Sequence, residues 1–324
     1  MINTVRGAIP AGSLGKTLLH EHIVFGFDGC TADLTLAPYR PDLAIERSVA
    51  IVELLKGYGV TTICDATPSN CARDVEVMAQ VSALTGINIV CATGLYNELL
   101  SSTGYFRYHE ILGRDIEKEM EELFLAEIET GIGSKGIRPG YIKVGSSKGE
   151  ITSYEQNIFR AAVKAHKKTG LPIITHTHDG TMEKEQADYF LKLGANPAKV
   201  MIGHMCGDPD IKNHLYVLER GFYAGFDRFA QEVYLPDRTR VKMLLELLDK
   251  GYINQMLLSH DHVFNWRDRE WEEYKTPAGK LTDRQRTESA KLFSTIVGEL
   301  KANGVTEGMV NTIFVDNPRK YLNV

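Results

Sequence analysis

Eight short apolar runs recur along the chain, and most are rich in the β-branched residues that favour strands. They are Thr17–His22, Val60–Asp65, Ile89–Thr93, Tyr141–Val144, Pro172–His176, Val200–His204, Phe222–Asp227 and Gln255–Asp261. Most are followed by polar residues, glycine or proline, which break strands. The pattern therefore predicts eight buried strands.

Between most of these runs, apolar residues recur every three or four positions, which is the spacing of an amphipathic helix. Residues 44–57 carry Val49, Val52 and Leu55 in this way, and the same spacing predicts helices over Arg73–Thr85, Gln156–Lys168 and Glu183–Gly194. Strands that alternate with helices form parallel βαβ units, and eight such units predict a closed (β/α)₈ barrel.

The sequence contains no Pro/Ser-rich linker, so we expect one domain over residues 1–324. Two longer insertions interrupt the alternation, at residues 94–140 and at residues 262–284, which carry Trp266, Trp271 and Tyr274. An apolar helix is predicted near Glu288–Leu300, and a last short helix at Asn317-Pro318.

Composition narrows the class of protein. The 43% hydrophobic and 24% charged residues are typical of a globular chain, and the net charge of −5 comes without a basic stripe for nucleic acid. No run of about 18 apolar residues and no secretory leader is recognisable, so we expect no membrane segment. The five cysteines include no Cys-x-x-Cys pair, which favours a reducing, cytoplasmic setting.

Ionisable residues stand at the ends of the predicted strands. His20 and His22 are two apart, so a strand places both imidazoles on one face. Lys143, His176, His204 and Asp261 follow at or near the ends of later strands. In a barrel these ends converge on one mouth, where active sites lie, and imidazole with carboxylate is a typical ligand set for a transition metal.

A single histidine at a strand end is more often a satisfied polar residue than a ligand, and a single lysine is usually a surface residue. The metal hypothesis therefore depends on the whole group occurring together. His109, His166 and His214 lie outside this pattern, and we expect them at the surface.

The order His-x-His, Lys, His, His, Asp resembles that of the amidohydrolase superfamily. Within it, the chain resembles the phosphotriesterase-related family, especially the phosphotriesterase-like lactonases. The matching stretches are Thr17–His22, Ala92–Tyr96, Ile174–Thr177, Ile202–His204, Gly225–Phe229, Leu258–Asp261 and Asp316–Pro318.

The resemblance implies a role for each ligand position. His20, His22 and Asp261 would hold a buried divalent ion, and His176 and His204 a more exposed one. Lys143 would be carboxylated by CO₂ and bridge both ions. A hydroxide between the ions would be the nucleophile, and Asp261 would take its proton. The metal could be zinc, cobalt, manganese or iron, with zinc the first expectation.

The resemblance also implies where substrate is recognised. Tyr96 matches a tyrosine that lies against the substrate in the lactonases, and Arg228 matches an arginine typical of that branch. Alternatively, Arg228 is a structural residue that pairs with Asp227 or another carboxylate. Asp227 is expected to orient a group that lies behind the metal ligands. The roles of His178, His260 and His262 are left open.

The leading hypothesis is a binuclear-metal lactonase or carboxylesterase acting on lactones such as N-acyl homoserine lactones. Organophosphate triester hydrolysis is the runner-up, as a side activity of the same nucleophile. A phosphorylated sugar lactone is the third candidate substrate. It would need basic groups at the mouth, for which Arg228, Lys148, Arg238, Arg267, Arg269 and Lys275 are available.

Other classes of protein are disfavoured by the motifs. The sequence lacks the Gly-x-Ser-x-Gly elbow of α/β-hydrolases and the Gly-x-x-x-x-Gly-Lys-Ser/Thr loop of nucleotide-binding proteins. A non-catalytic metal-binding protein on the same barrel remains an alternative, although every ligand position is kept. The resemblance further suggests a homodimer.

Overall fold

The computed structural model describes residues 1–101, 103–268 and 280–324. Within them, parallel strands form one sheet in chain order: β3 (Lys16–Glu21), β4 (Val60–Asp65), β5 (Asn88–Gly94), β6 (Tyr141–Lys143), β7 (Ile173–Ile174), β8 (Val200–Ile202), β9 (Tyr223–Phe226) and β10 (Met256–Leu258). Every neighbouring pair is parallel. Each strand therefore presents its carboxyl end at the same side of the sheet.

The sheet closes between its first and last strands, at the segments that follow them. The backbone N–H of Asp261 donates to the carbonyl of His20 at 2.9 Å, and that of His22 donates to the carbonyl of His262 at 2.9 Å. The backbone N–H of Phe264 donates to the carbonyl of His22 at 2.8 Å. The predicted (β/α)₈ barrel is confirmed.

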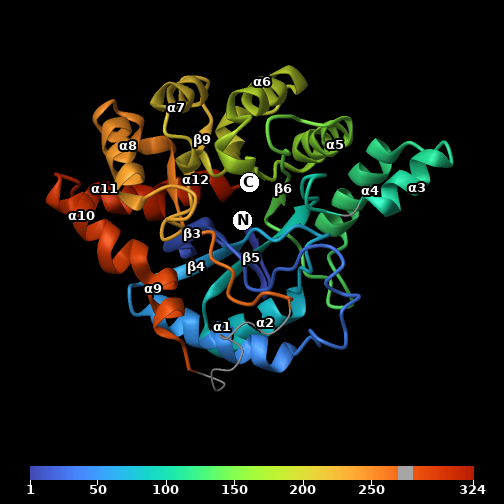
Figure 1. The fold of residues 1–324 in the computed structure, drawn as a ribbon, viewed down its shortest axis with the longest axis horizontal. Helices are drawn as coiled ribbons and strands as arrows, with labels where there is room; N and C mark the ends of the chain where they lie inside the picture. Colours follow the sequence, from blue (N-terminus) through green and yellow to red (C-terminus); the bar gives the residue numbers. More distant parts are fainter. Residues whose placement is uncertain (102, 269–279) are drawn as a thin grey trace.

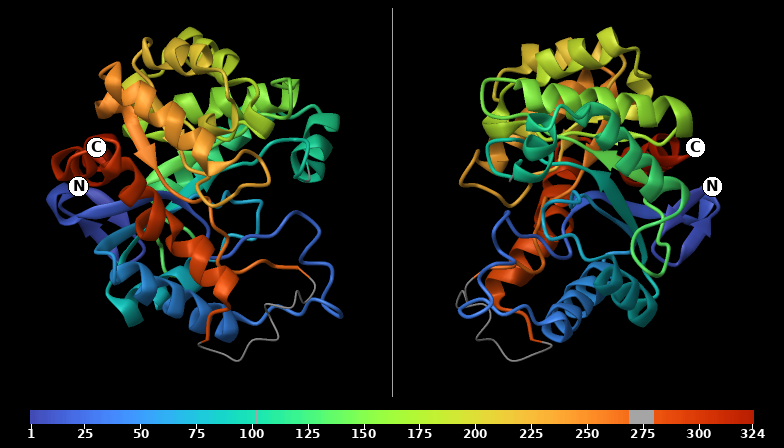
Figure 2. Two further views of the ribbon diagram at one scale, coloured as in Figure 1. Left: turned by 60° about the vertical axis from the view of Figure 1, so that its left-hand side comes forward. Right: turned by 90° about the vertical axis from the view of Figure 1, so that its right-hand side faces the viewer.

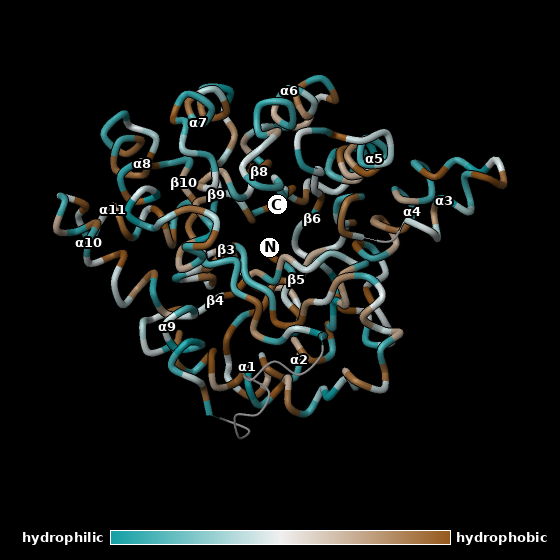
Figure 3. Tube along the Cα trace, in the orientation of Figure 1, coloured by the Kyte–Doolittle hydropathy of each residue, from teal (hydrophilic) through white to brown (hydrophobic). Residues whose placement is uncertain are grey.

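The helices surround the strands as an outer ring (Figure 1). They are α1 (Pro41–Lys56), α2 (Val75–Thr85), α3 (Gly104–Ile111), α4 (Ile116–Glu129), α5 (Ser153–Thr169), α6 (Glu183–Leu193), α7 (Ile211–Leu218), α8 (Asp237–Asp249), α9 (Asp283–Lys291), α10 (Val297–Ala302), α11 (Glu307–Asn311) and α12 (Asn317–Leu322). Hydrophilic and hydrophobic positions alternate along these helices (Figure 3), so that one face of each packs on the barrel.

Local sequence signals set the helix ends. Thr152 and Glu155 form a capping box at the start of α5, and Gly170 ends the helix in the left-handed conformation. The Asp74 side chain accepts hydrogen bonds from the backbone of Glu76 and Val77 and so begins α2. These caps determine where α2 and α5 begin and where α5 ends, and so where the chain turns back toward the next strand.

The floor of the barrel is closed by both ends of the chain, which lie close together (Figure 2). A hairpin of β1 (Ile2–Thr4) and β2 (Gly7–Ile9) and the helix α12 contribute to a second apolar cluster inside the barrel. Tyr321 is fully buried there, and its hydroxyl donates to the carbonyl of Ile173 at 2.6 Å. Apolar packing therefore fills the barrel below the mouth.

Several sequence expectations differ from the structure. The 94–140 stretch contains α3 and α4, and α4 takes the place of an ordinary barrel helix between β5 and β6. The helix expected at residues 288–300 is divided by a π-helical segment, Leu292–Ile296. A second π-helical segment, Thr312–Asp316, precedes α12. Trp271 and Tyr274 lie outside the described residues.

The surface assignment of two histidines was wrong. His166 is buried, where its Nδ1 donates to the carbonyl of Leu171 at 2.8 Å, and His214 is fully buried with its Nδ1 on the carbonyl of Asp210 at 3.1 Å. They lie on the buried faces of α5 and α7, where a backbone hydrogen-bond partner offsets part of the cost of burying a neutral imidazole. His109 is partly exposed and pairs with Glu119 at 2.6 Å.

Candidate metal centre

The strand ends bring the six predicted ligands to one place at the mouth. His20 and Lys143 belong to β3 and β6, and the other four follow β3, β7, β8 and β10 within three residues. His20, His22, Lys143, His176 and His204 are buried, and the side chain of Asp261 is 12% exposed. Buried ionisable groups gathered in this way are typical of a functional site.

Asp261 lies at the centre of the group. Its Oδ1 is 3.0 Å from His22 Nε2 and 3.4 Å from His20 Nε2, and its Oδ2 is 3.8 Å from His204 Nε2. Lys143 Nζ is 3.0 Å from His20 Nε2. The His176 and His204 ring centroids are 4.6 Å apart. One carboxylate and four imidazoles thus face the same small volume.

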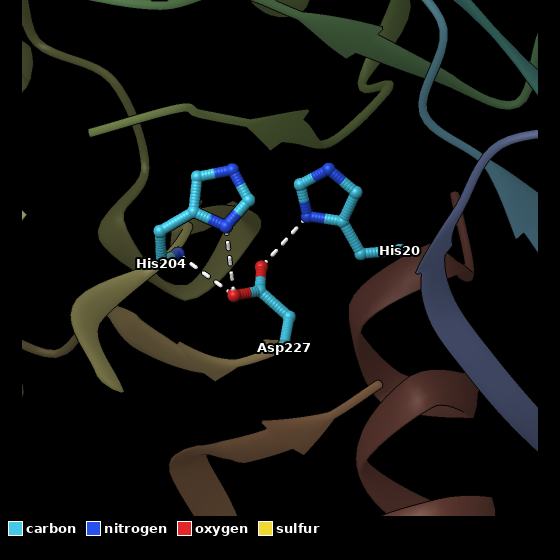
Figure 4. A group of neighbouring side chains, drawn as sticks. All are labelled: His20, His204 and Asp227. Atoms are coloured by element: carbon cyan, nitrogen blue, oxygen red, sulfur yellow. Dashed lines mark hydrogen bonds and ion pairs between the residues drawn. The ribbon is translucent and has the colours of Figure 1, made fainter. Parts of the chain in front are cut away.

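Asp227 sets the orientation of two of these imidazoles (Figure 4). Its Oδ2 accepts from His20 Nδ1 at 2.7 Å, and its Oδ1 accepts from His204 Nδ1 at 3.0 Å and from the His204 backbone N–H at 2.9 Å. Because a carboxylate accepts only, both rings carry the proton on Nδ1 and keep the Nε2 lone pair for a ligand. Asp227 therefore bonds directly to two of the predicted ligands, whereas the sequence had suggested a role behind them.

His22 has the same tautomer for a different reason. Its Nδ1 lies 2.9 Å from the hydroxyl of Thr67, which itself donates to the carbonyl of Val24 at 3.2 Å. The hydroxyl proton is therefore committed, and the imidazole must donate. Nothing in the sequence pattern had indicated Thr67, because its role depends on contact between two loops.

Two of the predicted ligands have an unusual backbone. His204 and Asp261 adopt φ values of 59° and 54°, in the left-handed region. Such a conformation in a residue other than glycine costs about 1–3 kcal/mol and is concentrated at functional sites. The fold thus holds these two side chains in orientations that a relaxed backbone would not give.

Burial controls the charge of the group. It lowers the pKa of His204 to about 3 and holds that of His176 well below its ordinary value, so these imidazoles are neutral near pH 7. Burial would raise the pKa of Asp261, but the groups around it, which include a hydrogen bond to His22 and the charge of the Arg228 guanidinium, hold it well below the ordinary value. Neutral imidazoles beside an ionised carboxylate are the donor set that a divalent transition metal prefers.

Lys143 fits this set only after a chemical change. Burial lowers its pKa to about 8, so about a tenth of the side chain is neutral amine near pH 7, far more than for an ordinary lysine. An ammonium has no lone pair for a metal and repels a cation. A neutral amine attacks CO₂ and releases one proton to give a carbamate, whose oxygens are suitable ligands.

The mouth opens into a pocket of about 820 Å³. One wall is apolar and is formed by Phe25, Phe27, Leu100 and Trp266. Phe25 packs edge-on against Phe27 and Trp266, with ring centroids 5.2 and 5.4 Å apart. This wall continues directly from the group of predicted ligands, so a substrate at the centre would place its remaining part against hydrophobic side chains.

Tyr96 and Arg228 both line the pocket. The Tyr96 hydroxyl lies 3.4 Å from the ring nitrogens of His176. Arg228 forms an ion pair with a carboxylate, as expected if its role is structural. The carboxylate is that of Asp261 and not that of Asp227, and the Arg228 Nε lies 3.0 Å from Asp261 Oδ2. Its guanidinium also lies 4.6 Å from the Tyr234 ring centroid. Both side chains therefore contact predicted ligands.

His178, His260 and His262, whose roles the sequence left open, differ in their contacts. His178 lines the pocket, and its Nδ1 is 3.2 Å from His176 Nε2. His262 also lines the pocket, and burial lowers its pKa to about 4. His260 lines the pocket as well, but both nitrogens of its imidazole are engaged elsewhere, with Nδ1 donating to Glu21 at 3.1 Å and Nε2 accepting from Leu292 N–H at 3.2 Å.

The candidate phosphate-binding cations are mostly engaged elsewhere. Lys148 pairs with Asp179 at 3.0 Å, and the Arg267 guanidinium lies 4.3 Å from the Tyr39 ring centroid. Neither of them, nor Arg238, is among the residues lining the pocket. Arg269 and Lys275 lie outside the described residues.

Comparison with known proteins gives a consistent result. Residues 1–322 match the model of the phosphotriesterase family. A phosphotriesterase homology protein of Mycobacterium tuberculosis is 33% identical, over 98% of this chain and 96% of its own length. An aryldialkylphosphatase of Saccharolobus solfataricus is 32% identical, over 98% and 97%. A phospho-furanose lactonase of Mycoplasmopsis synoviae is 28% identical, over 98% and 90%.

Among solved structures, a mutant of the Deinococcus radiodurans PTE-like lactonase superposes with a TM-score of 0.92 at 38% identity and covers 100% of both chains. The similarity therefore extends over the whole barrel.

Proposed function

Because this chain belongs to the phosphotriesterase family and is thus a hydrolase of ester bonds, we propose that it is a binuclear-metal lactonase. Its substrates are lactones and other carboxylic esters, with N-acyl homoserine lactones as the first class to test, and organophosphate triester hydrolysis is a side activity. The observation that carries this proposal is the cluster of four imidazoles, Asp261 and Lys143 beside an apolar pocket.

The ligand positions divide between two ions. His20, His22 and Asp261, whose donor atoms lie within 4.8 Å of one another, would hold the buried ion. His176 and His204 would hold the more exposed ion, and carboxylated Lys143 would supply an oxygen to each. When bound, a pair of divalent ions, zinc or else cobalt, manganese or iron, lowers the pKa of a water from about 15.7 to ~7 and polarises a substrate oxygen.

The chain itself supplies proton transfer and orientation. The Asp261 carboxylate, held ionised by its neighbours, accepts the proton of the attacking water and passes it to the leaving alkoxide. Tyr96, whose pKa burial raises, stays protonated and donates a hydrogen bond to the substrate. Arg228 lies beside Asp261 and orients the ester.

The pocket favours a neutral substrate with an apolar chain. Among the described residues of its wall, the arginines are already paired: Arg228 with Asp261 at 3.0 Å and Arg284 with Glu288 at 2.8 Å. A phosphorylated sugar lactone needs cations that are available to its phosphate. The apolar side formed by Phe25, Phe27 and Trp266 suits an acyl chain instead.

A substrate panel tests this proposal. Metal-loaded enzyme is assayed with N-acyl homoserine lactones of several chain lengths, a phosphorylated sugar lactone and an aryl dialkyl phosphate, with the Asp261→Asn variant as the blank. We expect the highest kcat/KM on the acyl lactones and weaker turnover of the phosphotriester. Lactone turnover no higher than that of Asp261→Asn would contradict the proposal.

We also propose that the enzyme is a homodimer through α3. Tyr105, Tyr108, Ile111 and Leu112 are exposed on and just after this helix, which projects from the barrel (Figure 1). Contiguous apolar side chains of this size are seldom left in water. Light scattering should give a dimer for the wild type and a monomer for an Ile111→Lys/Tyr105→Lys variant. A monomeric wild type would contradict it.

A cytoplasmic location is part of the same proposal. Five cysteines are free and four of them are buried, as in proteins that fold under reducing conditions. Within the described residues, no helix combines the length and the apolar character needed to cross a bilayer. Cell fractionation tests the assignment.

A further inference from the structure

Glu21 stands between two predicted ligands, His20 and His22, yet its side chain turns away from them. It is 1% exposed, and a carboxylate buried this deeply must be satisfied by hydrogen bonds. Within the described residues, the hydrogen-bond partners of this side chain belong to the segment that follows β10, on the opposite side of the seam where the barrel closes.

The contacts of Glu21 surround Asp261. Its Oε1 accepts from the Ser259 hydroxyl at 2.8 Å, from the His260 backbone N–H at 2.9 Å and from His260 Nδ1 at 3.1 Å. Its Oε2 accepts from the His262 backbone N–H at 3.0 Å. The carboxylate thus holds the residues on both sides of Asp261.

The same segment is linked back to the first strand and to the next loop. The Ser259 hydroxyl accepts from the His20 backbone N–H at 3.0 Å. Gln231 Nε2 donates to the carbonyls of His260 and Asp261 at 2.9 and 2.7 Å. His20 and Asp261 are therefore tied to one hydrogen-bond network although they are far apart in the sequence.

This network explains how Asp261 keeps its left-handed backbone, with φ of 54°. Such a conformation persists only where the surroundings over-determine it. The bonds from Glu21 to the N–H groups of residues 260 and 262 fix the peptide planes next to Asp261. Without them, the strained residue can relax and carry its carboxylate away from His20 and His22.

We propose that Glu21 is a positioning residue of the metal centre: it clamps the turn at Ser259–His262 so that the Asp261 carboxylate meets His20 and His22. This inference rests on the proposed metal site and adds to it a residue that contacts neither substrate nor metal. The clamp acts in the metal-free protein, because its bonds join only groups of the chain.

The test replaces Glu21 by Gln, which keeps the size but leaves an NH₂ where an oxygen accepted from His262. A matched control exists in Glu155→Gln. Glu155 is also fully buried, and its oxygens accept from the Glu98 backbone N–H, the Ser147 hydroxyl and the Thr152 backbone N–H. Both variants lose the same kind of bond, but the control has no bond to the Asp261 turn.

The readout is the dissociation constant for Zn²⁺, measured on the folded protein by competition with a chromophoric chelator, together with amide exchange of the metal-free protein. We expect Glu21→Gln to weaken metal binding about 10–100-fold, as for other residues that orient ligands. Exchange at His260 and His262 should accelerate. Glu155→Gln should lower stability while leaving Zn²⁺ affinity unchanged.

Should Glu21→Gln fail to fold, Ser259→Ala replaces it. This change removes the hydroxyl shared by Glu21 and the His20 N–H, and we expect a smaller loss of Zn²⁺ affinity in the same direction. The proposal is overturned if the folded variants bind Zn²⁺ as the wild type does and lose only stability. A wild type that binds no metal would overturn the proposed function, and with it this role.

Discussion

Asp227 controls two candidate ligands at once, because one carboxylate accepts the Nδ1 protons of His20 and His204. In Asp227→Asn, only one oxygen remains to accept, so one imidazole loses the partner that fixes its tautomer. We expect the metal dissociation constant to rise about 10–100-fold, measured by chelator competition.

A suitable control is again Glu155→Gln, which alters another buried carboxylate, one that accepts from the Ser147 hydroxyl and from the backbone N–H groups of Glu98 and Thr152. Metal affinity should be unchanged in this variant. An equal loss in both variants would mean that Asp227 acts through general stability rather than through His20 and His204.

The end of β5 shows how closely neighbouring strands approach one another at the mouth of the barrel. Gly94 has a φ of 118°, and a Cβ atom there would lie 1.9 Å from the carbonyl oxygen of Lys143. Gly94→Ala must therefore push β5 away from β6, the strand that carries Lys143. We expect a loss of at least about 2 kcal/mol of stability and a lower metal content, from urea unfolding and metal analysis.

Gly149→Ala is the matched control, since Gly149 has a positive φ of 71° but nothing within 4 Å of the added Cβ. It should lose about 1 kcal/mol or less, from backbone strain alone. If Gly94→Ala lost no more stability or metal than Gly149→Ala, the close packing of β5 on β6 would not contribute to stability or to metal binding.

A second prediction concerns the contact between the start of α6 and the loop after β8. Burial, together with a hydrogen bond to Asp208, raises the pKa of Glu183 to about 8. The folded state therefore keeps a proton that the unfolded state releases near pH 4.5. The contribution of this group to the free energy of unfolding consequently falls as pH rises from about 5 to 8.

Melting temperatures of metal-free wild type and Glu183→Gln, measured at several pH values, check this. The stability of the wild type relative to the variant should decline from pH 5 to pH 8 and then level off. A difference that does not vary with pH would show that the proton is not held by Glu183.

For the molecule as a whole, the chain ends are part of the core. Tyr321 from α12 fills the barrel floor and bonds to β7 through Ile173. Tyr321→Ala should cost about 3–5 kcal/mol, whereas Tyr321→Phe, which loses only the hydrogen bond, should cost about 1 kcal/mol. Urea unfolding of both variants measures the difference, and equal losses would show that the ring does not stabilise the floor.

The sequence by itself determined the barrel, because eight apolar runs alternating with amphipathic stretches leave little choice of topology. It also identified the predicted ligands, since ionisable residues at strand ends are exceptional. It did not identify the residues that hold these ligands in place. The tertiary structure alone showed that Thr67, Glu21 and Gln231 hold His22 and Asp261 in place. These are ordinary polar residues, and their importance comes from contacts across loops and across the barrel seam, which no periodicity along the chain encodes.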